Sequence, residues 1–422
     1  MIKAINGYAA LAVISLILRL AAFMIDMPFF WDVQTFQAWA VMLFEGGFSY
    51  FYYSDAFTDY PPMYMYVLWI IGAVRYALGL DFLSPGFNFL IFLPAIISDI
   101  ITVLLLYTLC RRIFPESHAL LIAFAYSVNP AVILNSSVWG QVDAIHTLLL
   151  FLAFYYISKK QVLPVYLLYG IAVLTKPQTL IVAPIFLYSA FHYVKEREYS
   201  YKAALTMFGY AAVVFLFMAF LSLPFGVHLV IQQYIDTVGS RPFGSINAYN
   251  FYALTGGNWQ PITLFYAILS VIAILGVTCM SFWILHRHWN MAAIFFTGAL
   301  LYIVTFVFSV RMNERYLFPA LLFMLVAACE FYSKYSAHGQ PSDKRSKSIM
   351  QLFVLYIGFS ATFFMNCLDV LLRAYDIELV TNRITMAHRP IDDFIAFISF
   401  LQVSLAIWYM KLGRDIGKWT DL

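Results

Sequence analysis

The sequence is 422 residues long, with 63% hydrophobic and 11% charged residues and a formal net charge of +3 at pH 7. This composition excludes an ordinary soluble globular protein and predicts an integral membrane protein with several helical spans. The small net charge, without a basic run interleaved with aromatic residues, also argues against a nucleic-acid partner.

Hydrophobic segments long enough to cross a bilayer recur along the chain, beginning with residues 4–24. Arg19 near the far end of that segment, and the lack of a small-residue cleavage site, favour a retained helix over a removed signal peptide. Further runs follow at 88–109, 117–136, 141–158, 162–175, 178–194, 203–224, 262–285, 290–310, 315–333, 349–371 and 393–410. The sequence therefore predicts an all-α, polytopic bundle of about 12 transmembrane spans.

Basic residues between the runs predict the orientation of this bundle. They lie at Lys3, Arg111, Arg112, Lys159, Lys160, 195–202, Arg287, 334–347 and 411–418. All of them share one side, the cytoplasm, if every run crosses once and the apolar run 61–80 does not cross. We therefore expect residues 61–80 to form a helix that lies along, or dips into, the opposite interface.

The non-cytoplasmic side then receives most of the polar motifs. It includes residues 26–87, 135–143, 176–178, 225–261, 311–315 and 372–392. We expect a main transmembrane module at 1–333, a polar cytoplasmic linker at 334–348 and terminal transmembrane helices at 349–422. The four cysteines lie in or beside apolar runs, so we expect core residues rather than a disulfide or metal framework, and we expect no cofactor.

Asp32, in Trp31-Asp32, is the first candidate for chemistry. It lies in the first non-cytoplasmic loop, where a carboxylate is hydrated and close to a lipid-borne group. Glycosyl transfer to a hydroxyl needs a group that accepts a proton, and a loop carboxylate is suited to that role. The alternative is a turn-forming or loop-capping aspartate. No acidic residue lies one or two positions away, so an Asp-x-Asp metal clamp is absent.

The motif Asp59-Tyr60-Pro61-Pro62 opens the run 61–80. Two prolines fix the backbone as it enters a helix, and proline is tolerated in the first helical turn. Asp59 and Tyr60 are thus either substrate contacts or part of a purely structural helix start.

Trp139, Gln141 and Asp143 form a polar cluster at a turn between two runs. An aromatic face suits the C–H surface of a sugar, and amide and carboxylate groups suit its hydroxyls. An interfacial tryptophan with an aspartate helix cap is the structural alternative.

Lys176 and Gln178 interrupt two short runs at Thr175-Lys176-Pro177-Gln178. Such a break is typical of a helical hairpin that dips partway into the membrane and lines a cavity. A cation at that depth is costly unless it meets an anion. The alternative is that the lysine extends to water.

Arg311-Met312-Asn313-Glu314-Arg315-Tyr316 is the densest charged group near a membrane edge. Two arginines can bind a phosphate bidentately while Glu314 orients one of them. A structural ion-pair cluster at a helix start is the alternative.

These motifs together resemble the integral-membrane glycosyltransferases of the GT-C superfamily. The resemblance is greatest to bacterial mannosyltransferase-like proteins related to the enzyme that adds the second mannose of GPI anchors. It extends to the dolichyl-phosphate-glucose-dependent glucosyltransferases of N-glycan assembly. The matching pieces run in the expected order from Asp32 through Asp59-Tyr60-Pro61-Pro62, Asn129-Pro130, Trp139 to Asp143 and Lys176-Pro177-Gln178 to the 311–316 motif.

The resemblance implies a GT-C fold with interfacial helices in the first loop, a polyprenyl-phosphate sugar donor and inverting transfer of mannose or glucose outside the cytoplasm. It implies Asp32 as general base and Lys176, Arg311 and Arg315 on the donor phosphate. The other expected substrate contacts are Asp59, Tyr60, Trp139, Gln141, Asp143, Gln178 and Glu314. One departure is Asn313, where the group usually has a histidine, so a charge available there is lost.

The acceptor is expected to be a lipid-linked, glycan or protein hydroxyl, and a prokaryotic plasma membrane, with its lipids as partners, is favoured over the endoplasmic reticulum. The lack of a Gly-rich phosphate loop agrees with a donor that carries no nucleotide. The main alternative function is a transporter or flippase of a lipid-linked sugar, which would use a similar cavity without chemistry. Inverted repeats would favour that alternative, and none is visible.

Overall fold

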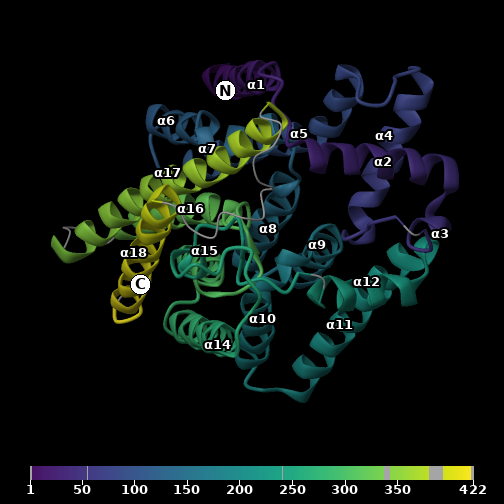
Figure 1. Ribbon diagram of the computed structural model, residues 1–422. Helices are drawn as coiled ribbons and strands as arrows, with labels where there is room; N and C mark the ends of the chain where they lie inside the picture. Colours follow the sequence, from purple (N-terminus) through teal and green to yellow (C-terminus); the bar gives the residue numbers. More distant parts are fainter. Residues whose placement is uncertain (1, 55, 240, 337–342, 380–392, 420–422) are drawn as a thin grey trace. The chain divides into compact units, whose positions relative to one another are not determined.

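The computed structural model describes residues 2–54, 56–239, 241–336, 343–379 and 393–419. The described chain is helical apart from two short strands (Figure 1). It divides into two compact units, each built from separate stretches of sequence. Unit 1 comprises Met1–Ile25, Asp99–Trp139 and Pro242–Leu422, and unit 2 comprises Asp26–Ser98 and Gly140–Arg241.

Unit 1 contains most of the long helices. Its elements are α1 (Ile2–Phe23), the second half of α5 (Pro85–Cys110), α6 (Glu116–Ser127), α7 (Pro130–Ile133), the π-helix η1 (Leu134–Trp139), β1 (Ser245–Ile246), α13 (Phe251–Leu254), α14 (Leu264–Arg287), α15 (Met291–Phe308), β2 (Met312–Asn313), α16 (Phe318–Ser336), α17 (Asp343–Leu379) and α18 (Asp393–Ile416).

Unit 2 consists of shorter helices and the first half of α5. Its elements are α2 (Phe30–Gly46), α3 (Phe48–Phe51), α4 (Pro62–Ala77), α8 (Asp143–Ser158), α9 (Val162–Thr175), the 3-10 helix η2 (Pro177–Val182), α10 (Ala183–Lys195), α11 (Tyr201–Ser222), the 3-10 turn η3 (Leu223–Phe225) and α12 (Val227–Gly239).

Seven of the described helices are long and apolar enough to cross a membrane, or eight if the bent pair at 116–127 and 130–139 forms one span. The polytopic, all-α prediction is therefore confirmed, whereas the expected number of about 12 spans is higher than this number. Four runs account for the difference: those at 141–158 and 162–175 form the shorter apolar helices α8 and α9, and those at 178–194 and 315–333 are not among the candidate spans of the described chain. Composition alone does not distinguish a short buried helix from a complete span.

The predicted domain boundaries remain a prediction. The expected linker at 334–348 falls partly outside the described residues, because 337–342 are not described, and the same holds for the expected non-cytoplasmic loop at 372–392. In the described part, α16 extends to Ser336 and α17 begins at Asp343.

The core of unit 1 is organised around α15. Every residue from Ala292 to Val307 is buried, and Thr305, 8% exposed, is the most accessible of those with a measured side chain. Helices α14, α16 and α18 pack against α15. A helix that is apolar on all sides is typical of a protein core or a membrane span, and here neighbouring helices cover it.

A buried ion pair joins α1 to α5 within unit 1. Arg19 Nε lies 3.1 Å from Asp99 Oδ2, and both side chains are at most 1% exposed. Ser136 Oγ donates a hydrogen bond to the same oxygen, and Arg19 Nη1 donates to the carbonyl oxygens of Ser15 and Ser127 at 3.3 Å. Removing either charge would leave the other buried and uncompensated.

Unit 2 is held together by close helix packing between α2 and α4. A Cβ atom on Gly72 would lie only 2.3 Å from the carbonyl oxygen of Ala40, so only glycine permits this approach. Aromatic rings of α2 and of the loop before α4 also pack together: Phe36 meets Tyr60 edge to face, and Trp39 is tilted against both. This packing fixes the segment that carries Asp59 and Tyr60.

Candidate functional site

The predicted site residues fall into two groups, one in each unit. Unit 2 contains Asp32, Asp59, Tyr60, Gln141, Asp143, Lys176 and Gln178, and unit 1 contains Trp139, Arg311, Glu314 and Arg315.

Asp32 lies in the first turn of α2, where the positive end of the helix dipole favours a carboxylate. The amide of the fully buried Gln141 donates a hydrogen bond to Asp32 Oδ2. The Tyr60 hydroxyl in turn donates to Gln141 Oε1 at 3.4 Å. Three residues distant in sequence thus form one hydrogen-bonded chain that ends on the carboxylate.

Gly140 makes the contact between Gln141 and Asp32 possible. Its φ of +87° lies in a region that residues with a side chain rarely adopt. A Cβ atom at this position would lie 2.8 Å from the ring of Phe92 and 3.0 Å from Val33, the neighbour of Asp32. The backbone therefore passes close to α2 only because residue 140 has no side chain.

Lys176 and Asp143 form a second buried group. Lys176 Nζ is paired with Asp143 Oδ1, and both side chains are 1% exposed. The ammonium also lies 5.9 Å from the centroid of the Tyr60 ring. Lys176 thus meets an anion, as the cost of a buried cation requires, and does not extend to water. The carboxylate of Asp143 already compensates its charge.

The helix break expected at Thr175-Lys176-Pro177 is present. Helix α9 ends at Thr175, Lys176 has extended backbone dihedrals, and η2 starts at Pro177. Proline cannot continue the hydrogen bonding of the preceding helix, so the break follows from the sequence. Gln178 lies on η2, two positions after Lys176.

Asp59 forms an ion pair with Arg241, which lies outside the sequence motifs. Arg241 Nη2 lies 3.2 Å from Asp59 Oδ2, with the two side chains 37% and 22% exposed. Gln233 on α12 donates its amide hydrogen to the carbonyl oxygen of the adjacent Thr58. The segment after η3 is therefore attached to the start of the Asp59 motif at two points. No sequence pattern pairs residues so far apart.

Tyr52 supports the same segment from the first loop. Its hydroxyl donates a hydrogen bond of 2.7 Å to the carbonyl oxygen of Tyr60. Burial, followed by the nearby Tyr234, raises the pKa of Tyr52 well above its ordinary value of 10. Tyr52 therefore stays protonated at neutral pH and acts as a donor, not as a base.

The 311–316 motif forms a tight turn in unit 1. Arg311 has a φ of +65°, and its backbone N–H points to the carbonyl oxygens of Phe243 and Gly244. The following strand, β2, pairs in parallel with β1. Arg315 Nη1 lies 2.7 Å from Glu314 Oε1. Glu314 thus orients Arg315, which is the geometry predicted for this pair.

Two residues of unit 1 are more buried than the sequence suggested. Trp139 is fully covered in η1, so its ring offers no face to a sugar in this conformation. The neighbour of Asp32, Trp31, is instead 63% exposed. Asn313 is 3% exposed and donates to the Tyr316 hydroxyl at 2.7 Å, so the amide is used inside the turn. These placements leave the substrate role of Trp139 a prediction.

Comparison with known proteins relates part of the chain to a family. Residues 59–223 match the family model of the dolichyl-phosphate-mannose-protein mannosyltransferases. This range includes the Asp59, Trp139 and Lys176 motifs but neither Asp32 nor the 311–316 turn. No curated protein matches the sequence. Among solved structures, ArnT from Cupriavidus metallidurans bound to undecaprenyl phosphate is similar, with 12% identity and a TM-score of 0.44 over 96% of this chain and 77% of that chain.

Proposed function

We propose that this chain is a membrane glycosyltransferase related to the GT-C superfamily. It transfers a hexose from a polyprenyl-phosphate donor to an acceptor hydroxyl on the non-cytoplasmic side. The family match over residues 59–223 supports this resemblance, and its description refers to dolichyl-phosphate-mannose, a polyprenyl-phosphate sugar. The hexose is mannose or glucose, and the acceptor is a lipid-linked, glycan or protein hydroxyl.

The observation that carries this proposal is the hydrogen-bonded chain from Tyr60 through Gln141 to Asp32. A carboxylate has about four lone-pair sites on its two oxygens, and Gln141 uses one of them. In the proposed complex Asp32 accepts a hydrogen bond from the acceptor hydroxyl while Gln141 keeps its orientation fixed. A carboxylate whose orientation is fixed in this way transfers a proton efficiently, because it does not need to reorient in the transition state.

The proposed step is a single displacement. The acceptor oxygen attacks the anomeric carbon, its proton passes to Asp32, and the bond from that carbon to the phosphate oxygen breaks. The polyprenyl phosphate leaves with the bonding electron pair, so the configuration at the anomeric carbon inverts. Cations stabilise the negative charge that develops on the phosphate.

We assign Lys176, Arg311 and Arg315 to the donor phosphate. In the described structure Lys176 is neutralised by Asp143 and Arg315 by Glu314. Binding of a phosphate would therefore compete with these carboxylates, and each carboxylate would hold its cation in place while the site is empty. We further assign the exposed ring of Trp31 to stacking on the sugar.

The test of the proposal is the Asp32→Asn variant, assayed for release of polyprenyl phosphate from radiolabelled mannosyl and glucosyl donors, with solubilised membranes as the acceptor source. The amide is nearly isosteric but cannot accept a proton, so the rate should fall by roughly 10² to 10⁴. Asp26→Asn is the matched control, because Asp26 is exposed in the connection just before α2 and its φ of +52° suits asparagine. Asp32→Asn retaining more than about a tenth of the rate would exclude this base, since general-base loss costs far more. A transporter would release no polyprenyl phosphate from either donor.

A further inference from the structure

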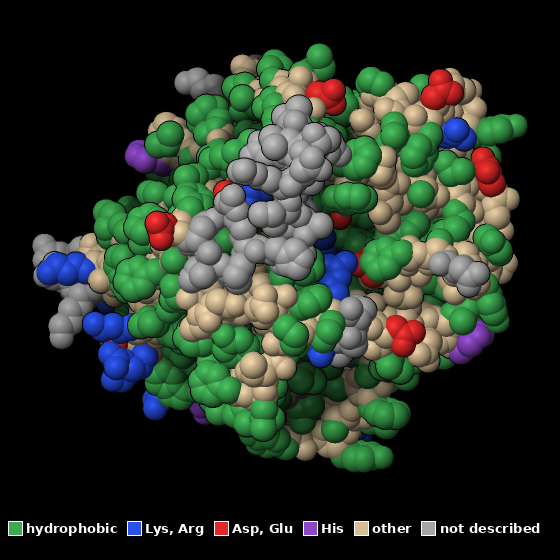
Figure 2. Space-filling view, in the orientation of Figure 1, with side chains coloured by type: hydrophobic (Ala, Val, Ile, Leu, Met, Phe, Trp, Pro, Cys, Tyr) green, Lys and Arg blue, Asp and Glu red, His purple; other side chains and the backbone are tan. Residues whose placement is uncertain are grey.

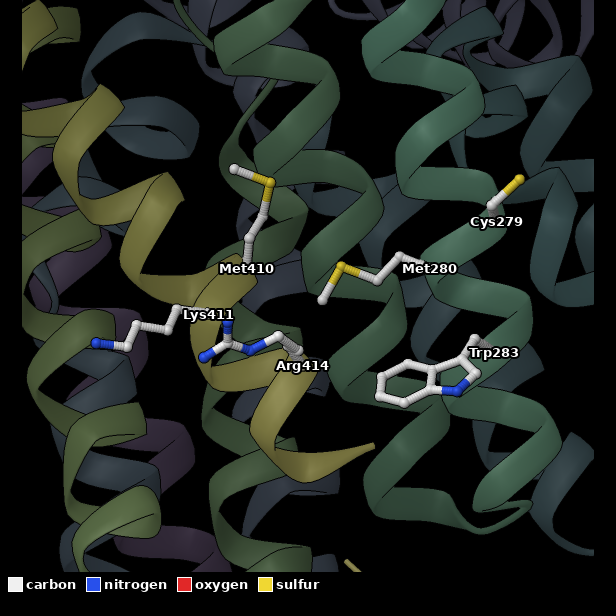
Figure 3. Close-up of a pocket in the computed structure, with 6 residues that line it drawn as sticks. All are labelled: Cys279, Met280, Trp283, Met410, Lys411 and Arg414. Atoms are coloured by element: carbon white, nitrogen blue, oxygen red, sulfur yellow. The ribbon is translucent and has the colours of Figure 1, made fainter. Parts of the chain in front are cut away.

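A cavity of about 590 Å³ opens between α14 and α18, near the C-terminal ends of both helices (Figure 3). It belongs to unit 1 and is distinct from the groups described above. Six residues line it: Cys279, Met280 and Trp283 from α14, and Met410, Lys411 and Arg414 from α18.

Beside this cavity, Gly413 in α18 and Gly417, just after the end of α18, bring the two helices close together. A Cβ atom on Gly417 would lie 2.1 Å from the ring of Trp283, and one on Gly413 would lie 2.8 Å from the terminal methyl of Met280. Glycines four positions apart lie on one helix face, so α14 side chains rest directly on the α18 backbone. One turn nearer the membrane interior, Met280 and Met410 form flexible apolar walls.

Two of the lining residues, Lys411 and Arg414, are basic, and they border the cavity with their apolar stems while their charged groups extend beyond it. Lys411 and Arg414 are three positions apart, so they share one face of α18, and Figure 3 shows them extending to the same side of that helix. Lys411 has no ion pair with another described residue. Arg414 pairs only weakly with its neighbour Asp415, at 3.3 Å with both side chains about half exposed.

The cavity lies at the edge of two candidate spans, Leu264–Arg287 and Asp393–Ile416. Basic side chains gather over this region, where α17 begins and α18 ends, while hydrophobic side chains cover most of the visible face (Figure 2). This is the end of the helices that the distribution of lysine and arginine assigns to the cytoplasm. Apolar walls and cations therefore meet at the depth of lipid head groups.

We propose that this cavity binds an anionic glycerophospholipid of the cytoplasmic leaflet. The lipid phosphate lies between Lys411 and Arg414, and part of an acyl chain lies along Met280, Met410 and Cys279. Basic pockets between spans on this side of a membrane favour such head groups. A small soluble anion would satisfy the cations but leave the apolar walls uncovered.

The experiment compares lipid retention by the purified full-length protein in native mass spectrometry. Phosphatidylglycerol and phosphatidylcholine with identical acyl chains are offered together, and the protein should retain phosphatidylglycerol preferentially. In the variant Lys411→Gln/Arg414→Gln this preference should fall by roughly fivefold for each cation removed. The matched control Lys195→Gln/Lys202→Gln removes the same charge from the end of α10 and the start of α11 in unit 2 and should keep the preference.

Cys279→Trp tests the apolar part separately, since it fills the space beside Met280 and leaves both cations in place. It should also reduce retention of phosphatidylglycerol. Unchanged retention in Lys411→Gln/Arg414→Gln would overturn the proposal. Displacement of the lipid by inorganic phosphate, with no effect of Cys279→Trp, would overturn it too, because the site would then recognise a free anion.

Discussion

At the scale of single residues, the hydrogen bond from Gln141 to Asp32 determines how the candidate base is oriented. Gln141→Leu removes the donor but keeps the volume of the side chain. We expect kcat to fall roughly tenfold, because a hydrogen bond to a charged group contributes about 1.5 kcal/mol or more. The KM for the donor should stay unchanged, since Gln141 acts through Asp32. Steady-state kinetics with the radiolabelled donor separate the two constants, and a change in KM alone would contradict this positioning role.

The ion pair between Lys176 and Asp143 permits a test that separates stability from substrate binding. Lys176→Met alone leaves a buried, uncompensated carboxylate and should destabilise the protein by about 3–5 kcal/mol. The double variant Lys176→Met/Asp143→Leu removes both charges, so thermal stability should recover. Donor affinity should remain weak in the double variant if Lys176 binds the phosphate. Full recovery of donor binding together with stability would show that the pair is only structural.

At the scale of elements, α4 decides the topology. It spans 16 residues and is not among the candidate membrane-crossing helices of the described chain. In a Cys279→Ser background, which removes the exposed native thiol, Ala56→Cys should react with a membrane-impermeant maleimide only from outside. Ser117→Cys should react only from the cytoplasm. Labelling of Ser117→Cys from outside would mean that α4 crosses the membrane.

The connection between α14 and α15 should make stability depend on pH. His288, 3% exposed, lies 3.0 Å through Nε2 from the carbonyl oxygen of Ile416. Burial lowers the pKa of His288 below 6.5. The hydrogen bond to Ile416 raises this pKa in part, and the positive charges of Lys334, Arg287 and Arg345 lower it further. The unfolded chain therefore binds a proton below about pH 6.5 while the folded chain does not, and stability falls as the pH drops through that value.

His288→Gln keeps a donor for Ile416 but does not titrate. Between pH 7.5 and 5.5, Tm should fall by less in this variant than in the wild-type protein. Groups that titrate elsewhere cancel in the comparison. Parallel Tm curves for the two proteins would show that His288 does not cause the dependence.

At the scale of the whole molecule, the sequence predicted the helical membrane class and the break at Lys176, because composition and local motifs determine these features. The roles of the site residues stay predictions. It could not predict that Gln141 contacts Asp32, since the two are 109 positions apart and meet only through the packing around Gly140. The rule that a buried cation meets an anion held for Lys176. Its partner in the described structure is Asp143, which the local pattern could not distinguish from a bound phosphate.

The pairing of Arg19 with Asp99 has a consequence for how the protein is made. The two residues are 80 positions apart, so α1 leaves the ribosome about 4–16 s before its partner at roughly 5–20 residues per second. During that interval the first helix carries an unpaired guanidinium that opposes membrane insertion by at most about 2.5–3.5 kcal/mol, the cost at a helix centre. We therefore expect the nascent α1 to enter the bilayer more completely once α5 has been made and Asp99 can pair with Arg19.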